Sequence, residues 1–189
     1  VGGSGSWYNT SWNYRKSIIV NSSQVQTNVT DFPVYVNLNN LGSDFFTNVK
    51  TDGGDIRVTT SDGLTEVPFE IVSINTGGQT GELHFKAPSL STSTNSTFYI
   101  YYGNTSASAY ATTTTYGARN VWTNGYEAVY HLNSNPASTT IDSTRHGRNL
   151  TQAGSMNSAD VVAGMVGNGI DFDGTDDRLS NAGFTWPNA

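Results

Sequence analysis

The densest run of potential metal ligands is DFDGTDD, residues 171–177. Asp171, Asp173 and Asp176 begin like the oxygen ligands of a calcium-binding loop, since hard cations prefer carboxylates. The bidentate Glu expected at the twelfth position of such a loop is replaced by Ala182. Aspartates beside glycine are also typical of solvated turns, and this interpretation is favoured. Calcium is therefore the one cofactor for which the sequence offers candidate ligands.

Residue types for nucleophilic catalysis are present but lack the motif that would present them. His131, Asp142, Ser143 and His146 supply a nucleophile, base and acid, yet no GxSxG elbow exists. The ExDxxE arrangement of jelly-roll glucanases is absent too, and the absence of cysteine excludes thiolate chemistry and disulfides. We expect no catalytic residues, and hence a protein that is not an enzyme.

Aromatic side chains are the stronger candidates for ligand binding, because sugar rings stack on the faces of Trp and Tyr. Trp12 is expected instead to anchor the core at the start of the first strand. An extracellular glycan is the ligand that the remaining edge aromatics predict. Those candidates are Trp7, Tyr8, Trp122, Tyr126 and Trp186.

Six Asn-x-Ser/Thr sequons are candidate glycosylation sites. The chain is so rich in Ser, Thr and Asn that about five would arise by chance. They therefore do not decide where the protein resides. The six asparagines are Asn9, Asn21, Asn28, Asn95, Asn104 and Asn149.

Charge and hydropathy exclude two classes of partner. The net charge is −6 and the charged residues make up 13% of the chain, so there is no basic stripe to bind nucleic acid. No apolar run reaches the roughly 18 residues of a membrane span. A surface covered by hydroxyls and amides rather than ion pairs is common outside cells, which predicts an extracellular or cell-surface location.

Period-two alternation predicts an all-β fold. In FPVYVNL, Phe32, Val34, Val36 and Leu38 share one face, as in a half-buried strand. Short strands separated by Gly-containing turns indicate an antiparallel, jelly-roll-like β-sandwich. The six expected strands cover residues 14–20, 32–38, 56–60, 67–74, 82–87 and 98–102.

One short helix is expected within residues 41–50. Leu41, Phe45 and Val49 are spaced by four, and Ser43 is a candidate N-cap. We expect a turn or two of helix there at most.

The domain organisation predicted from composition has four parts. Residues 1–6 form a Gly/Ser linker, residues 7–104 the sandwich, and residues 105–119 a Thr/Ser-rich linker. Residues 120–189 contain too few apolar positions to bury a confident core of their own. Strands are expected there in EAVYHLN, NGIDFDG and DRLSN, with GMVGNG as a flexible approach to the second of these.

The motifs SWNYRK, DFPV, GGDIRV and YYGN, in that order, resemble a domain of unknown function found in prokaryotic surface proteins. The resemblance covers about residues 7–104. The continuation VYHLN to DGTDDRLS is similar to the start of a laminin-G-like, concanavalin-A-like jelly roll. The resemblance implies a complete sandwich followed by an incomplete second jelly roll, displayed on a cell envelope or filament, with no implied reaction.

These observations favour a non-enzymatic extracellular module for adhesion or for assembly of a filament or surface layer. Unpaired strand edges of an incomplete jelly roll would let the chain pair with copies of itself. A carbohydrate-binding, lectin-like module is the alternative. A third is the non-catalytic part of a larger polysaccharide hydrolase.

Overall fold

The computed structural model describes residues 6–183, which fall into two compact units divided between Asn124 and Gly125. The first unit, up to Asn124, contains the expected sandwich. The second begins at Gly125. Each unit is described by itself below.

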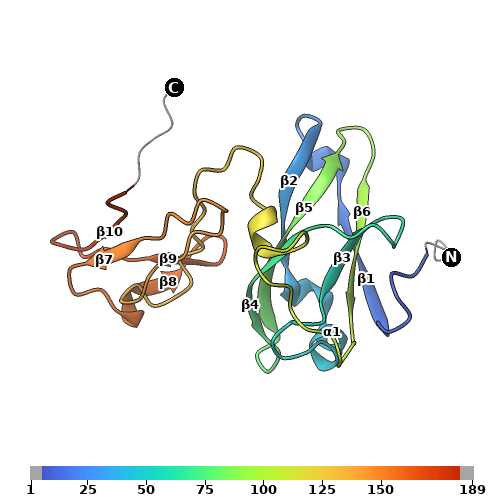
Figure 1. Ribbon diagram of the computed structural model, residues 1–189, viewed down its shortest axis with the longest axis horizontal. Coiled ribbons are helices and arrows are strands. Elements are labelled where there is room, and N and C mark those ends of the chain that lie inside the picture. Colours follow the sequence, from blue (N-terminus) through green and yellow to red (C-terminus); the bar gives the residue numbers. More distant parts are fainter. Residues whose placement is uncertain (1–5, 184–189) are drawn as a thin grey trace. The chain divides into compact units, whose positions relative to one another are not determined.

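The first unit is a β-sandwich of two antiparallel sheets, which confirms the predicted fold class (Figure 1). One sheet has the strand order β1-β6-β3 and the other the order β2-β5-β4. Every pairing between these strands is antiparallel. The strands are β1 (Tyr14–Val20), β2 (Val29–Asn37), β3 (Arg57–Thr60), β4 (Phe69–Asn75), β5 (Thr80–Leu90) and β6 (Ser96–Tyr102).

Alternation along the central strands builds the core. Leu83, Phe85 and Ala87 of β5 are fully buried, while the residues between them are partly exposed. Phe85 meets Phe98 of β6 with ring centroids 4.6 Å apart. Apolar burial of this kind contributes about 25 cal/mol per Å². The aromatic content of the chain thus fills the space between the two sheets.

The edge strand β2 follows the predicted alternation but leaves one aromatic exposed. Its register places Phe32 opposite Ala87 and Val34 opposite Phe85, so Phe32 and Val34 share the inner face. Phe32 nevertheless remains 41% exposed. The reason is its position on an edge strand, where a neighbouring strand covers one side only.

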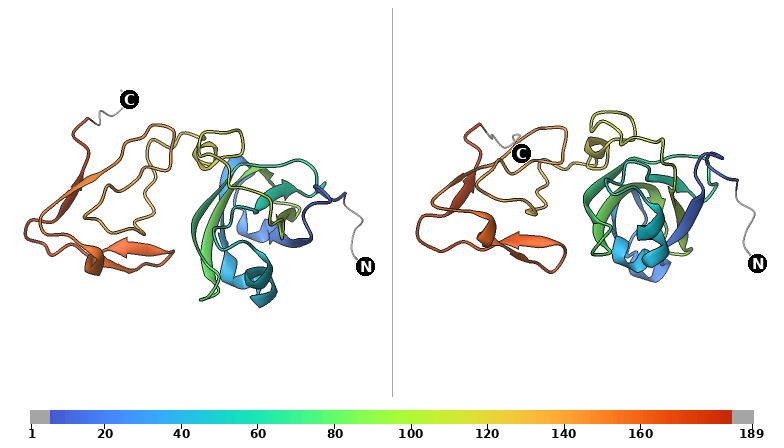
Figure 2. Two further views of the ribbon diagram at one scale, coloured as in Figure 1. Left: turned by 60° about the horizontal axis from the view of Figure 1, so that its bottom comes forward. Right: turned by 90° about the horizontal axis from the view of Figure 1, so that it is seen from below.

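The short helix α1 (Ser43–Asn48) lies across one end of the sandwich (Figure 2). Leu41, Phe45 and Val49 are buried as their spacing predicted. The N-cap is Gly42 rather than Ser43, which is already the first helical residue. Gly42 adopts φ 81°, a left-handed conformation that glycine tolerates best. Single turns of 3₁₀ helix lie at η1 (Ser22–Gln24), η2 (Leu38–Leu41) and η3 (Ala118–Asn120).

The stretch predicted as a linker, residues 105–119, is instead part of the first unit. Lys50 donates a hydrogen bond to the carbonyl of Ala107, and the Phe69 N–H donates to the carbonyl of Tyr116. Val121 is fully buried just beyond it. The sandwich therefore ends at Asn124 rather than near Asn104, and we call residues 105–124 the strap.

The second unit is made of short two-stranded hairpins. Strand β7 (Thr151–Ala153) pairs with β10 (Arg178–Ser180), and β8 (Val161–Ala163) pairs with β9 (Asn168–Ile170). The expected strands in NGIDFDG and DRLSN correspond to β9 and β10. No strand forms in the described structure at EAVYHLN, residues 127–133. One further 3₁₀ turn is η4 (Ser158–Asp160).

Candidate functional site

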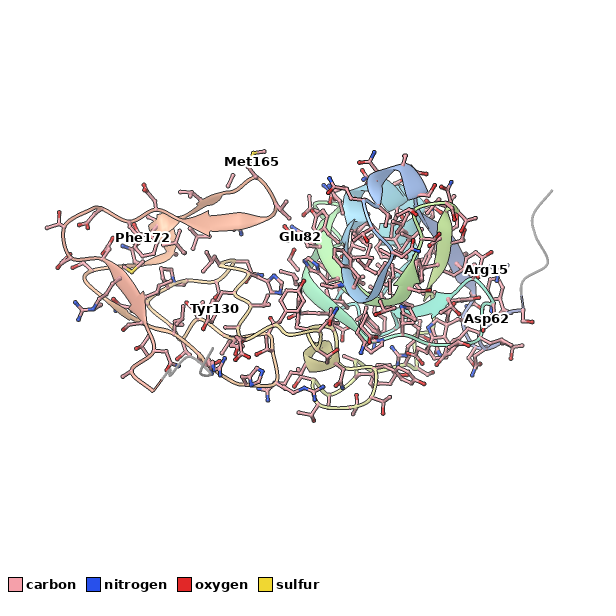
Figure 3. All side chains as sticks on the ribbon, turned by 90° about the horizontal axis from the view of Figure 1, so that it is seen from above. Arg15, Asp62, Glu82, Tyr130, Met165 and Phe172 are labelled. Carbon is pink, nitrogen blue, oxygen red and sulfur yellow. The ribbon has the colours of Figure 1, made fainter. Side chains whose placement is uncertain are left out.

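The predicted ligand-binding aromatics Trp7 and Tyr8 lie together on the outer face of the β1-β6-β3 sheet. The Trp7 ring is 39% exposed and stands edge-on to Tyr101 at 5.3 Å. The guanidinium of Arg15 lies 5.0 Å from the Trp7 ring and 4.3 Å from that of Tyr99 (Figure 3). Such cation–π contacts fix the rings in place. Trp7 is thus a partly exposed ring that Tyr101 and Arg15 hold in place on the sheet.

Tyr8 takes part in a buried polar group that we call the Glu66 cluster, formed by Tyr8, Arg57, Glu66 and Tyr110. The Glu66 carboxylate accepts hydrogen bonds from the hydroxyls of Tyr8, at 2.8 Å, and Tyr110, at 3.1 Å. Its other oxygen lies 3.7 Å from Nε of Arg57. Neither of these last two atoms has a hydrogen-bond partner within the described chain, so they interact as charges only.

The protonation of the Glu66 cluster reflects its burial. Burial raises the pKa of Glu66, while the hydrogen bonds from Tyr8 and Tyr110 and the charge of Arg57 oppose that shift. Burial likewise raises the pKa of both tyrosines, which therefore remain protonated donors. The cluster attaches the N-terminal segment and the strap to the sandwich. These contacts give the cluster a structural role.

Asp55 holds the ends of β1 and β6 together in what we call the Asp55 clasp. The residue is fully buried, and its carboxylate accepts hydrogen bonds from the N–H groups of Lys50, Gly103 and Asn104. Its carbonyl accepts a further bond from the Trp12 indole at 2.5 Å. Trp12 is 9% exposed, so it anchors the core as expected.

The other predicted aromatics are not gathered with Trp7. Trp122 is only 7% exposed, its indole donates to Glu70 at 2.6 Å and its ring packs 5.0 Å from His84. It therefore attaches the strap to the β2-β5-β4 sheet rather than forming an open platform. Tyr126 is half-buried in the second unit. Trp186 lies outside the described residues.

The predicted calcium ligands are rearranged in the structure. Carboxylate oxygens of Asp173, Asp176 and Asp177 lie within 4.8 Å of one another, so Asp177 replaces Asp171 in the group. Asp173 accepts bonds from the N–H groups of Thr175 and Asp176, and these bonds lower the pKa of Asp173. Carboxylates bonded in this way form the turn between β9 and β10. Calcium binding stays a prediction of the sequence.

Asp142, one of the residues whose types could serve nucleophilic catalysis, instead holds a loop of the second unit in place through hydrogen bonds. Its buried carboxylate accepts bonds from the N–H groups of Val129, Thr144 and Arg148 and from the Thr144 hydroxyl. Burial by itself would raise the pKa of Asp142, but these hydrogen bonds outweigh it and the pKa is lowered. Both carboxylate oxygens of Asp142 thus accept hydrogen bonds from within this loop.

The sequons differ in exposure. Asn9, Asn21, Asn28 and Asn95 are exposed. Asn104 and Asn149 are half-buried, and each accepts a backbone hydrogen bond through its side chain. Glycosylation of any of them stays a prediction.

The β8–β9 hairpin presents an apolar tip. The first four residues of GMVGNG, the segment predicted to be a flexible approach, form its turn, which is closed by a bond from the Gly164 N–H to the Gly167 carbonyl at 2.9 Å; the last two belong to β9. Met165 is 103% exposed, Val166 60% and Val162 40% (Figure 3). We call these three side chains the hairpin knob. No charged residue lies between Val161 and Ile170.

An apolar groove of about 470 Å³ opens on the first unit where the edge strands β1 and β2 are joined. We call it the edge groove. Its floor includes Leu90, which is buried, and its rim includes Phe32. No charged side chain lines it. The remaining lining residues are Val20, Gln24, Val25, Gln26, Thr27, Val29, Pro33, Val34 and Tyr35.

Sequence reasoning missed both the Glu66 cluster and the edge groove. The charged pair Arg57 and Glu66 in a chain with few charges was an available signal for the cluster, as was Tyr110 within the polar strap. The groove had no such signal, because it depends on how the two sheets are placed face to face.

No helix in the described part of the chain is both long and apolar enough to cross a membrane. Comparison with curated proteins and with solved structures finds no match for this chain. Residues 52–118 match the family model described as a domain of unknown function, DUF2341. The matched segment contains β3 to β6 and most of the strap, including Arg57, Glu66 and Tyr110. That segment is thus similar to a domain of unknown function, which confirms the predicted resemblance to such a domain; the motifs SWNYRK and DFPV lie before the matched residues.

Proposed function

We propose that this chain is a non-enzymatic module of an extracellular or cell-surface assembly, in which the second unit of one copy binds another copy. The observation that carries the proposal is the poor burial of that unit. Among residues 125–183, Met156 is the one large apolar side chain that is buried. In the same range five large apolar side chains are exposed, namely Ile141, Val162, Met165, Val166 and Phe172.

Two-stranded hairpins of this size are marginally stable by themselves. They gain stability when further strands or another apolar surface covers them. Exposed apolar patches of this kind are typical of protein interaction sites. Association with another copy supplies such cover, and the absence of charged residues from 161 to 170 lowers the cost of removing water from the hairpin.

The first unit supports a scaffold role in the same proposal. Seventeen buried side chains form one continuous core, and the acidic groups Asp55 and Glu66 are used to hold segments together. Such a rigid sandwich is suited to spacing interaction surfaces along an assembly.

Sedimentation velocity over a broad concentration series, with electron microscopy of the same samples, tests the proposal. We expect the sedimentation coefficient to rise with concentration and ordered particles or filaments to appear. A chain that remains monomeric at every concentration would contradict it.

Carbohydrate binding is the second candidate, favoured by the partly exposed Trp7 ring beside Arg15. A sugar that stacks its apolar face on such an indole ring gains affinity from that contact. A glycan array on wild type and on Trp7→Ala tests this candidate. Binding that Trp7→Ala abolishes would support it, and an array without hits above background would exclude it.

A further inference from the structure

We propose that the hairpin knob of one copy inserts into the edge groove of a second copy, so that copies associate head to tail. This inference rests on the proposed assembly function and names its contact. The occupant is Met165 with Val162 and Val166, and the receiving site is the groove rimmed by Phe32.

The two surfaces match in chemistry. The groove is lined mainly by Val, Leu, Pro and aromatic side chains, and the knob consists of Met and Val. The groove volume of about 470 Å³ lies within the 300–1,000 Å³ range of pockets that enclose a small ligand. Methionine is unbranched and flexible, so it adapts to an irregular apolar pocket.

The two surfaces also match in charge. The chain carries a net charge of −6, so two copies repel each other over most approaches. Neither the residues 161–170 of the hairpin nor the lining of the groove contains a charged side chain. Contact between them therefore buries no ion, and the desolvation cost is small.

The symmetry of the contact decides what assembles. A knob and a groove on different parts of one molecule form a heterologous contact, which leaves a free knob and a free groove at the ends. Unless the rotation between copies closes a ring, such contacts continue as a filament. The knob and the edge groove alone are thus enough for a filament to grow, and no second kind of interface is needed.

Two single substitutions at exposed positions test the contact. Met165→Asp removes the knob, and Phe32→Asp removes the rim of the groove. Met165 is fully exposed, whereas Phe32 is 41% exposed on an edge strand, so circular dichroism and thermal unfolding matching those of wild type are required of each variant. Each should raise the dissociation constant for self-association by about 10- to 100-fold, the effect of losing one buried large apolar side chain. Leu64→Asp is the matched control, since Leu64 is 53% exposed on the turn after β3.

Mixing the two variants gives the decisive result. The Phe32→Asp chain keeps an intact knob and the Met165→Asp chain keeps an intact groove, so an equal mixture should form one-to-one dimers that grow no further. A mixture that stays monomeric would overturn the head-to-tail contact. Wild type that assembles while both variants assemble equally well would overturn this contact and leave the proposed function standing. Monomeric wild type would overturn both.

A cross-link provides a measurement that does not depend on weakened binding. The chain contains no cysteine, so Met165→Cys and Gln24→Cys, introduced in separate chains, create a single pair of thiols. Oxidation of the mixture should give a disulfide-linked dimer, because Gln24 lines the groove. Failure to cross-link at concentrations where wild type assembles would contradict the contact, and Leu64→Cys in place of Gln24→Cys is the control.

Discussion

The hydroxyl of Tyr8 donates a hydrogen bond of 2.8 Å to Glu66, a residue 58 positions further along the chain. The same carboxylate oxygen accepts a bond from Tyr110 of the strap. One buried carboxylate thus joins the N-terminal segment and the strap to the sandwich.

Glu66→Ala should destabilise the first unit by about 3–5 kcal/mol, because it leaves the buried charge of Arg57 without its partner. Tyr8→Phe removes one hydrogen bond and should cost about 1 kcal/mol. Chemical denaturation measures both. Asp44→Asn, which breaks the exposed ion pair with Lys16, is the control and should leave the midpoint unchanged. Equal effects of Glu66→Ala and Asp44→Asn would contradict the structural role of the Glu66 cluster.

A fragment ending at Asn104 should fail to fold stably, whereas a fragment ending at Asn124 should fold. The strap supplies the buried side chains Val121 and Trp122 and the Tyr110 ring that packs on Arg57 at 4.1 Å. Without it those apolar contacts are lost and Arg57 is uncovered. Circular dichroism and thermal unfolding of the two fragments check this expectation. Similar cooperative transitions in both would show that the strap is dispensable.

Asp62 should stabilise the turn after β3 only while it is ionised. The hydroxyl of Thr65 and the N–H groups of Leu64 and Thr65 donate to its carboxylate and lower the pKa of Asp62 below its ordinary value of 3.8. A lowered folded-state pKa gives stability that is present above the unfolded value and is lost as the pH falls through the folded one.

The measurement is the stability difference between wild type and Asp62→Ala as a function of pH. The difference should be constant near neutral pH and shrink progressively below about pH 3.8. Asp62→Asn keeps one oxygen acceptor but not the charge, so it should fall between the two. A difference that grows on acidification would refute the assigned role.

Backbone amides of the second unit should exchange with solvent faster than those of β5 and β6 when the chain is monomeric. Local opening costs little where few apolar side chains are buried, and Met156 is the single large one within residues 125–183. Hydrogen exchange followed by mass spectrometry checks this. Protection of the β8–β9 hairpin should rise under assembling conditions. Equal protection of both units in dilute monomer would argue that the second unit needs no partner.

Strands of the first unit were predictable because alternation and turn residues are local signals. All six appear, with β1 at the expected residues 14–20. The end of the unit was not predictable in this way. Residues 105–119 show no hydrophobic period, yet Tyr110 and Tyr116 contact the sandwich through hydrogen bonds that only the tertiary structure creates.

The candidate binding residues show the same division. Trp7 and Tyr8 are neighbours in sequence, so their proximity in space was implied, but the burial of Trp122 against Glu70 and His84 was not. In the second unit GMVGNG predicts a flexible approach to the next strand, but not that the segments on both sides of it pair as a hairpin. Pairing depends on partners that a single segment does not reveal.

The Asp55 clasp has a consequence for mechanical load. Tyr14, at the start of β1, pairs with Tyr102, at the end of β6, so the chain enters and leaves this ladder at the same end. Tension pulling the two flanking segments apart would unzip the ladder one rung at a time instead of shearing all rungs together. The bonds from Trp12 and Gly103 to Asp55 lie across that end, and they bear the force once the outer contacts of Tyr8 and of the strap have broken. A module stretched between neighbours would therefore resist extension at the Asp55 clasp before β1 separates from β6.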